Sequence, residues 1–553
     1  MGFLTIASFL GFTILVAVIS WFTTRKTDEN SAEGYYLGGR TLGAITIAGS
    51  LLLTNLSAEQ IVGLNGQAFE EGIMVMAWET LAAIAMVITA IFLLPKYMKR
   101  GITTIPQFIE TRFDKQTKAL LSILFLFAYA IVLLPTILYS GSLAFSTMFD
   151  LPNTLNIDSW YVIWFCVWTI GIIGMTYAIF GGLKAVAVSD LINAIGLLVG
   201  GILIPFFGLL LIGGGSLQTG LNTLWNANPG KFDITGAVDS SIPFDTLFTG
   251  MMLAQIYYWG TNQSILQRVF GAKSLKEGQK GMLLAAFVKF IIPVIVVLPG
   301  IISWHLFNGQ LDNADQAYPA LVAKVLPTAW TGFFAAVLFG AVLSSFNSIL
   351  NSSVTLFGVD LYRFFFKQQA SDSETVKAGK RFGLGLGVVS MTIAPFIANA
   401  PDGLFSYIQQ SLGSLSIPIL AVVIIGILTK KVPAIGAKIV MIVGVILYLI
   451  SLIFLEPYFR DTALISAQAQ GITDASQLSI IKAKAYPHYL HIMGILFVFN
   501  VTIMLFFGWL RPKKEVEIEV TTNAIEITPW KYDIGVGAFI TLLVISTYFI
   551  FTQ

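Results

Sequence analysis

Long apolar stretches alternate with short polar connections along the whole chain. Most of these stretches reach about 20 residues, which is the length that an α-helix needs to cross roughly 30 Å of hydrocarbon. They predict fourteen membrane-spanning helices, over residues 3–23, 43–67, 73–95, 119–147, 158–179, 186–213, 246–265, 282–305, 329–361, 383–398, 403–428, 434–455, 488–510 and 533–551. The pattern therefore indicates an all-α integral membrane protein that crosses the lipid bilayer many times.

Composition agrees with this class. Of the 553 residues, 56% are hydrophobic and only 11% are charged, whereas soluble domains carry about 25% charged residues. The first apolar stretch has no basic residue before it, and Arg25 and Lys26 follow it. A signal peptide has the opposite order, so we expect a retained helix with its N-terminus outside.

The distribution of Lys and Arg tests this topology, because cytoplasmic connections are enriched in basic residues. With the N-terminus outside, the connections on the cytoplasmic side hold 26 of the 32 basic residues, the outer connections hold five, and Lys289 lies within a helix. This bias supports fourteen spans with both termini outside, in a plasma (inner) membrane. We expect no nucleic-acid partner and a monomer or weak homodimer.

Several function classes receive no support from the sequence. A single cysteine, Cys166, excludes an intrachain disulfide and a cysteine-cluster metal site. There is no GxxxxGK[ST] phosphate loop, and the longest polar segments, 214–245, 456–487 and 511–532, are too short for a nucleotide-hydrolysing domain. We therefore expect neither an enzyme nor a nucleotide-driven pump, and no organic cofactor.

Ionisable residues inside the predicted spans are rare, and such residues usually mark a pathway through the bundle. They are Glu59, Glu79, Asp190 and Lys289. Each also has a structural interpretation. Glu79 and Lys289 could form only a buried ion pair between two helices, Asp190 could complement a helix dipole, and Glu59, for which we favour the structural role, could cap backbone amides.

Polar residues gather at three places within the spans. The segment 54–60, TNLSAEQ, holds five polar side chains, which is typical of a transporter helix broken near the midplane so that its backbone carbonyls can bind an ion or substrate. A second cluster lies at 253–263, five spans later, as two five-helix repeats of opposite topology would require. In the third cluster, 340–353, Ser344 and Ser345 could bind one cation or could simply bond to their own helix.

These clusters and their surroundings resemble the sodium:solute symporter family, in its bacterial sodium/galactose (sodium/glucose-type) branch. The resemblance covers roughly residues 30–430. It depends on GYYLGGR (34–40), NLSAEQIVG (55–63), KRGITTIPQFIETRFDK (99–115), YAIFGGLKAVAVSD (177–190), YYWGTNQSILQRVFGAKSLKEGQKG (257–281), VKFIIPVIVVLPG (288–300), AVLSSFNSILNS (341–352) and YIQQ (407–410).

The resemblance implies a LeuT-type fold of two inverted five-helix repeats, at 31–215 and 216–430. One extra helix with its link, 1–30, would precede them, and three helices, 431–553, would follow. Carried over by position, the family's sodium site would use backbone carbonyls of Leu53, Leu56 and Ala341 and the hydroxyls of Ser344 and Ser345. Asp190 would lie near the inward sodium route.

The same resemblance implies a sugar site made of Asn55, Gln60, Glu79, Gln255, Lys289 and Gln409, with the ring of Tyr258 stacked under the sugar as an inner gate. A packing role for Tyr258 is the alternative. The chain departs from the galactose-transporting pattern at Ala82, which replaces a hydroxyl side chain, at Gln255, which replaces a shorter amide, and at Leu53, which replaces alanine. The first two departures change the polar reach of the sugar site.

The residue types also suit a sugar or polyol on chemical grounds. Hydroxyls donate and accept, so amides, one carboxylate and one ammonium group can bind them, often over an aromatic ring. A carboxylate-bearing substrate would favour an arginine, and no predicted helix core contains one. We therefore predict Na⁺-coupled uptake of a small neutral sugar or polyol by alternating access. The alternatives are a sodium symporter for an amino acid or organic anion, or a membrane sensor with a transporter fold.

Overall fold

The computed structural model describes residues 3–24, 31–399, 403–513 and 525–551. Within these ranges the regular structure is helical, apart from two isolated β-bridges, Leu42 with Ala272 and Ser274 with Glu526. The predicted all-α class is confirmed. Most of the predicted link after the first helix, residues 25–30, and much of the last cytoplasmic connection, residues 514–524, lie outside the described residues.

The helices follow one another in three groups, in which η denotes a 3-10 or π-helical segment. The first group comprises α1 (Phe3–Thr24), α2 (Ala32–Leu37), η1 (Gly38–Arg40), α3 (Ala44–Asn55), α4 (Ala58–Glu71), η2 (Ile73–Met76), α5 (Ala77–Ile88), η3 (Thr89–Leu93), α6 (Leu94–Met98), α7 (Ile105–Arg112), α8 (Lys115–Ala128), η4 (Tyr129–Leu133), α9 (Leu134–Met148), α10 (Leu151–Leu155) and α11 (Ser159–Ile212). The second comprises α12 (Leu217–Ala227), η5 (Pro229–Phe232), η6 (Phe244–Phe248), α13 (Gly250–Gly260), α14 (Gln263–Phe270), α15 (Leu275–Lys289), α16 (Pro293–Val296), α17 (Leu298–Leu306), η7 (Ala314–Gln316), α18 (Ala317–Val325), α19 (Thr328–Thr355), η8 (Leu356–Tyr362), α20 (Arg363–Phe365), α21 (Asp372–Ile393), η9 (Ala394–Asn399) and α22 (Leu404–Leu428). The third comprises α23 (Ala434–Ile450), η10 (Ser451–Leu455), α24 (Glu456–Ala469), α25 (Ala475–Ala485), α26 (Tyr489–Leu510) and α27 (Asp533–Phe551).

Most of the predicted spans have a counterpart. In the described part of the chain, eleven helical runs are long and apolar enough to cross a membrane, and two bent helix pairs raise the number to 13. The run α11 supplies two of them, Ser159–Ile179 and Leu183–Ile212. The predicted span 246–265 is instead divided into the short helices α13 and α14, which Thr261 and Asn262 connect.

The predicted break in the second span is present. Helices α3 and α4 meet at an angle of 56°. The amide of Ser57 donates to the carbonyl of Asn55 at 2.9 Å, instead of continuing the helical pattern toward Leu53. The carbonyl of Leu53 is therefore left available to side chains from other helices.

The structure contains a further break that the apolar pattern did not predict. It lies between α15 and the α16–α17 segment, and the two parts are bent by 49° relative to each other. Helix α15 ends at Lys289, and α16 begins at Pro293. Proline has no amide hydrogen, and its ring clashes with the carbonyl four residues earlier, which here belongs to Lys289. The break therefore places Lys289 at a helix end.

The connections also differ from the prediction. The polar segment 456–487 is mostly helical and forms the α24–α25 hairpin, and 214–245 contains α12. Arg268, which we predicted in a cytoplasmic connection, lies in α14 and is fully buried. The predicted helix cores contain no arginine, but the structure adds Arg268 to a buried helix, because the helical segment continues beyond the apolar stretch.

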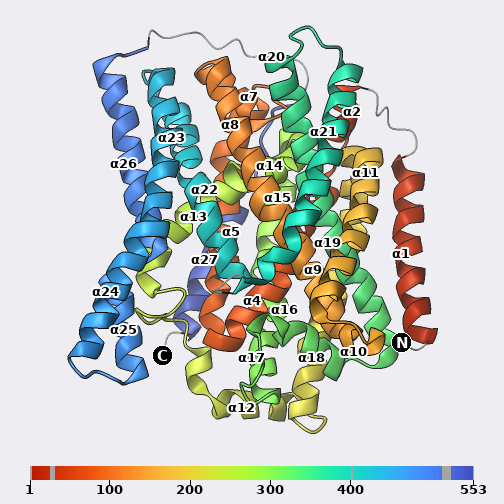
Figure 1. The fold of residues 1–553 in the computed structure, drawn as a ribbon. Helices are drawn as coiled ribbons and strands as arrows, with labels where there is room; N and C mark the ends of the chain where they lie inside the picture. The colour runs from red at the N-terminus through yellow and green to blue at the C-terminus, as the bar shows by residue number, and fades with distance from the viewer. Residues whose placement is uncertain (1–2, 25–30, 400–402, 514–524, 552–553) are drawn as a thin grey trace.

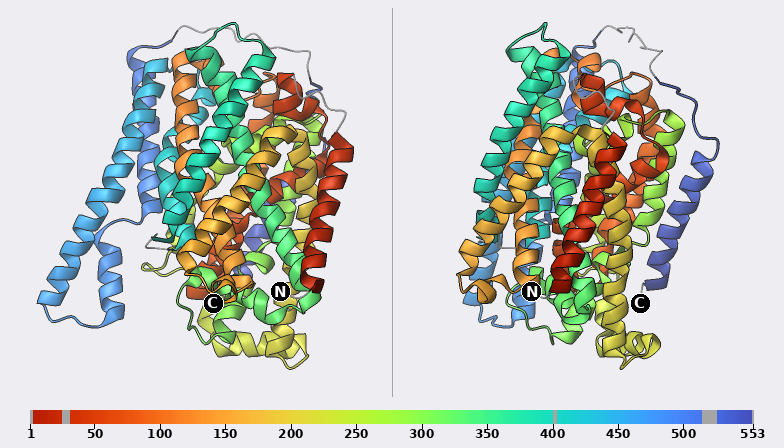
Figure 2. Two further views of the ribbon diagram at one scale, coloured as in Figure 1. Left: turned by 45° about the vertical axis from the view of Figure 1, so that its right-hand side comes forward. Right: turned by 90° about the vertical axis from the view of Figure 1, so that its right-hand side faces the viewer.

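The long helices stand side by side in one bundle (Figure 1). Helices α11 and α19 pack against each other, and α1 lies along both, while α27 packs on α5 and α15. The basic segments around α7 and α20 lie at one end of the bundle, and α12 and the α24–α25 hairpin lie at the other (Figures 1 and 2). Helix α1 begins and α27 ends at this second end.

Candidate functional site

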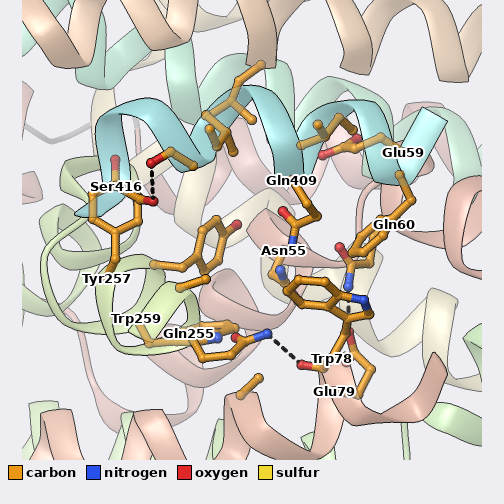
Figure 3. A pocket seen from close by; sticks show the side chains of 18 of the residues that line it. Asn55, Glu59, Gln60, Trp78, Glu79, Gln255, Tyr257, Trp259, Gln409 and Ser416 are labelled. Carbon is orange, nitrogen blue, oxygen red and sulfur yellow. Dashed lines mark hydrogen bonds between the residues drawn. The ribbon is translucent and has the colours of Figure 1, made fainter. Parts of the chain in front are cut away.

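A cavity of about 70 Å³ lies where α3, α4, α5, α13 and α22 meet (Figure 3). One water molecule needs about 10–15 Å³ on this kind of measure, so the cavity has room for several. Six of the seven residues predicted to bind substrate line it: Asn55, Gln60, Glu79, Gln255, Tyr258 and Gln409. The break between α3 and α4 brings Asn55 and Gln60 to this place.

Glu79 is at the centre of a buried network beside the cavity. One of its carboxylate oxygens accepts a hydrogen bond from Gln60 Nε2 at 2.5 Å, and the other forms an ion pair with Lys289 Nζ, also at 2.5 Å. Lys289 donates to the side-chain oxygen of Asn55 as well, and its ammonium group lies 5.5 Å from the ring centroid of Trp259. Lys289 therefore makes contacts with three residues around the site, Glu79, Asn55 and Trp259.

Lys289, the seventh predicted substrate ligand, does not line the cavity. Its side chain has no exposed surface, and Glu79 is 1% exposed. Two buried charges are tolerated when each neutralises the other and hydrogen bonds satisfy their remaining polar atoms. Lys289 therefore balances the charge of Glu79 and orients Asn55, both of which reach the cavity.

The other predicted ligands lie on α13 and α22. The amide nitrogen of Gln255 donates to the carbonyl of Trp78 at 2.9 Å, so its orientation is set (Figure 3). Tyr258 lines the cavity and packs edge-on against Trp259, with ring centroids 5.2 Å apart. Gln409 is half-buried and its side chain has no hydrogen bond to any described residue, so its side-chain amide is available to a ligand.

The structure adds residues to the cavity wall that the sequence analysis did not assign. They include Glu59, Trp78, Tyr257, Trp259, Phe405 and Ser416. Glu59, for which we favoured a capping role, lines the cavity, and its buried Oε2 has no partner among the described residues. The sequence contained one signal for this position of Glu59. It lies four residues after Asn55, and the two polar residues flank the helix break.

The predicted cation ligands lie at the same break. The hydroxyl of Ser345 donates to the carbonyls of Leu53 and Thr54, each at 3.2 Å. Leu56 and Ala341 are also buried, at the end of α3 and in α19 respectively. The structure thus brings Leu53 and Ser345 together directly and adds the carbonyl of Thr54, which the sequence analysis did not name. Carbonyl and hydroxyl oxygens are the ligands that a hard cation prefers.

Ser344 points toward Asp190 instead. Its hydroxyl donates to one oxygen of Asp190 at 2.5 Å, and Ser50 donates to the other at 2.6 Å. All three side chains are buried. Asp190 therefore links α3, α11 and α19 beside the candidate cation site. It accepts hydrogen bonds from two other helices, in addition to any effect of its charge on a helix dipole.

A second cavity of about 670 Å³ lies on the side of the bundle that we expect to face outside. Its wall is rich in acidic residues, including Glu70, Asp239 and Asp312. Phe405 lines both cavities, and its ring packs edge-on against Trp78 with centroids 5.3 Å apart. These two rings therefore lie between the larger cavity and the candidate substrate site.

Comparison with known proteins identifies the family. The model of the Sodium:solute symporter family matches residues 35–444, which is most of the chain. The chain is a sodium:solute symporter. Similar curated proteins are the uncharacterized symporter YidK of Escherichia coli K12, 42% identical over 96% of this chain and 88% of that protein, and the sodium/glucose cotransporter of Vibrio parahaemolyticus, 32% identical over 80% of this chain and 83% of that protein.

One further curated protein and two solved structures are similar to this symporter, and the solved structures compare the fold. The sodium/myo-inositol cotransporter 2 of Mus musculus is 28% identical over 93% of this chain and 78% of that protein. The solved structure of a Na⁺-coupled sialic acid symporter superposes with a TM-score of 0.69 and 21% identity, covering 93% of this chain and all of that chain. Mhp1, a nucleobase-cation symporter, superposes with a TM-score of 0.52 and 14% identity, covering 87% and 96%. The LeuT-type fold is confirmed, and the chain is a transporter rather than an enzyme.

Proposed function

We propose that this symporter couples the entry of Na⁺ to the uptake of a neutral sugar or polyol. The observation that carries the proposal is the charge balance of the cavity. The cavity wall contains no Lys or Arg among the described residues, and Lys289 behind it is neutralised by Glu79 and has no exposed surface. An anionic substrate would therefore find no cation in the cavity wall, whereas the amides of Asn55, Gln255 and Gln409 suit hydroxyl groups.

The glucose and myo-inositol cotransporters among the relatives support this substrate class. Aromatic residues support it too, because Tyr258, Trp78 and Trp259 line the same cavity. An aromatic face beside hydrogen-bonding groups is a common arrangement for polyols. Glu79 can accept from two adjacent hydroxyls of a sugar if the sugar displaces the amide of Gln60.

We assign Na⁺ to the oxygens around Ser345, with Leu53, Leu56, Ala341 and Ser344 as further ligands. Leu53 is two residues from Asn55, so the candidate cation and substrate sites share one backbone segment. Binding of Na⁺ would stabilise the broken conformation of this segment and so position Asn55. Asp190 is then the first acceptor for an ion that leaves toward the inside.

One Na⁺ supplies enough free energy for accumulation of the substrate. Its entry down 100 mV releases about 2.3 kcal/mol, and a tenfold concentration gradient adds about 1.4 kcal/mol. Together these values support roughly 400-fold accumulation of a neutral solute. We propose that the repeats 31–215 and 216–430 move relative to each other during this cycle, in a plasma membrane with both termini outside.

Uptake into proteoliposomes tests the function. Purified symporter is reconstituted, and uptake of radiolabelled glucose, galactose and myo-inositol is measured with an inward Na⁺ gradient and with K⁺ in its place. We expect uptake of at least one polyol that requires Na⁺. Na⁺-driven uptake of proline or acetate with no polyol uptake would indicate an amino acid or organic anion symporter, and binding without any uptake would indicate a sensor.

A further inference from the structure

A groove of about 530 Å³ lies between η8 and the start of α21. It is at the end of the bundle opposite the second cavity of about 670 Å³, which we call the outer cavity. This end contains α20 and the first turns of α21 (Figure 1). The groove has an aromatic floor and a basic rim, formed by Phe357, Tyr362, Phe366, Phe382, Lys377 and Arg381. The Na⁺ and substrate sites use none of these residues.

The floor is a set of stacked rings. Phe357 and Phe382 are parallel, with centroids 4.2 Å apart, and Tyr362 stacks on Phe366 at 5.9 Å. Phe366 remains 71% exposed, directly after the candidate span Trp330–Phe365. We expect an apolar surface at the end of a candidate span to lie near the boundary of the membrane, where it can contact the upper part of an acyl chain.

The rim holds two cations without a partner in the described part of the chain. Lys377 and Arg381 are exposed and four residues apart, so they lie on one face of α21. Two neighbouring cations already form ion pairs. Arg363 pairs with Asp372 at 2.8 Å, and Lys367 pairs with Glu374 at 2.5 Å. Glu374 also lines the groove, but its charge is neutralised by Lys367.

We propose that this groove binds one anionic phospholipid of the cytoplasmic leaflet. The phosphate group contacts Lys377 and Arg381, and the upper acyl chain lies on the rings of Phe357, Phe366 and Phe382. The connection 363–381 carries five basic residues and is cytoplasmic in the predicted topology, on the side where anionic lipids attract basic segments. Charge complementarity together with an apolar floor favours a lipid over a soluble phosphate compound.

Native mass spectrometry of the full chain tests the proposal. The protein is released from detergent micelles that contain equal amounts of dioleoyl-phosphatidylglycerol and dioleoyl-phosphatidylcholine, and the lipids retained are counted. We expect one phosphatidylglycerol retained by the wild type and lost from K377Q/R381Q. Each cation contributes about fivefold to affinity, so the double variant should bind roughly 25-fold more weakly. The control K482Q/K484Q, at the opposite end, should keep the lipid.

Two further measurements distinguish a bound lipid from a bound soluble anion. F366S removes an exposed ring, so it should weaken phosphatidylglycerol binding at unchanged thermal stability. Inorganic phosphate at millimolar concentration should not displace the lipid. Equal retention of phosphatidylglycerol by K377Q/R381Q and the wild type would overturn the proposal. Displacement by phosphate, with F366S without effect, would also overturn it, in favour of a site for a soluble anion.

Discussion

Individual side chains at the break between α3 and α4 connect the two candidate sites. Ser345 contacts the carbonyls of Leu53 and Thr54, and Asn55, one residue further on, receives a hydrogen bond from Lys289. The functional proposal therefore depends on a small number of oxygen atoms and one buried ion pair. Substitutions at these positions separate a ligand role from a packing role.

Replacement of Ser345 by alanine removes one proposed Na⁺ ligand. A hydrogen-bond-like contact to a charge contributes roughly 1.5–3 kcal/mol, so we expect the Na⁺ concentration for half-maximal uptake to rise about tenfold or more. Ser353→Ala is the matched control, because this hydroxyl lies in the same helix and donates to Ile349 within it. An unchanged Na⁺ dependence of Ser345→Ala in proteoliposomes would remove Ser345 from the cation site.

A double-mutant cycle on Glu79 and Lys289 distinguishes a sugar ligand from a partner of an ion pair. Glu79→Gln replaces an acceptor by a donor and should weaken sugar binding by about 1.5–3 kcal/mol. If the pair is only structural, the damage comes from the unpaired charge of Lys289. The double variant with Lys289→Gln should then recover stability and uptake. We expect recovered thermal stability without recovered sugar affinity. Restored uptake would contradict a ligand role for Glu79.

Tyr258 allows a test of aromatic stacking. The ring lines the cavity beside Trp259. If it stacks under a sugar, Tyr258→Phe should largely preserve affinity because the ring remains, and Tyr258→Ala should weaken binding severely. Sugar binding to the purified variants measures both. Equal affinity of Tyr258→Ala and the wild type would leave only a packing role.

Among the elements, α22 connects the candidate site with the outer cavity. Its residue Gln409 faces the candidate site, and Phe405 faces both cavities. The amide of Leu404, the first residue of α22, donates to Asp315 Oδ2 at 3.1 Å. Asp315 lies in η7, outside the candidate spans, and Gly66 of α4 approaches it so closely that a Cβ would lie 2.8 Å from Oδ1. Asp315 therefore joins α4 to the start of α22.

Burial of Asp315 raises its pKa to about 6, from an ordinary value of 3.8. The folded protein thus binds the proton more tightly than the unfolded chain, and this contribution to stability is lost as the pH rises from about 4 to about 6. The difference corresponds to about 3 kcal/mol. Asp315→Asn should remove this pH dependence of the thermal unfolding midpoint.

Asp312→Asn is the control for this measurement, because Asp312 is an exposed carboxylate of the same connection. It should retain the wild-type slope between pH 4 and pH 6. If Asp315→Asn keeps the same slope as the wild type, then Asp315 does not titrate in this range, and another carboxylate is responsible.

At the scale of the whole molecule, the positions of the helix ends are consistent with the topology that the basic residues predict. The start of α1 and the end of α27 lie at the same end of the bundle, away from the basic segments around α7 and α20 (Figures 1 and 2). The fourteen spans predicted from the sequence, an even number, require this arrangement. The basic residues predict the direction of insertion, because cytoplasmic connections are enriched in Lys and Arg.

Labelling of single cysteines tests the direction. The only native cysteine, Cys166, is buried, whereas Lys115 and Lys484 are exposed at opposite ends. In intact cells, a membrane-impermeant maleimide should label Lys484→Cys and leave Lys115→Cys unlabelled until the cells are permeabilised. The wild type serves as the background. The reverse result would invert the topology.

The sequence by itself determined the class, nearly all the spans and the identity of the polar residues at the second span. Hydropathy and basic-residue bias are sums over nearby residues, so they do not depend on which helices later become neighbours. The motifs from GYYLGGR to YIQQ likewise led to the correct family, because they preserve residue types at fixed spacing. The break at 54–60 was predictable, since polar residues inside a span need partners that an intact helix does not supply.

Only the tertiary structure decided which polar groups meet. Lys289 lies behind Glu79 rather than in the cavity wall, Glu59 lines the cavity, and Ser344 bonds to Asp190 rather than to Leu53. Arg268 is buried although it follows an apolar stretch, because α14 continues into the bundle. These outcomes depend on contacts between helices that are far apart along the chain, and no local pattern of hydropathy contains the geometry of such contacts.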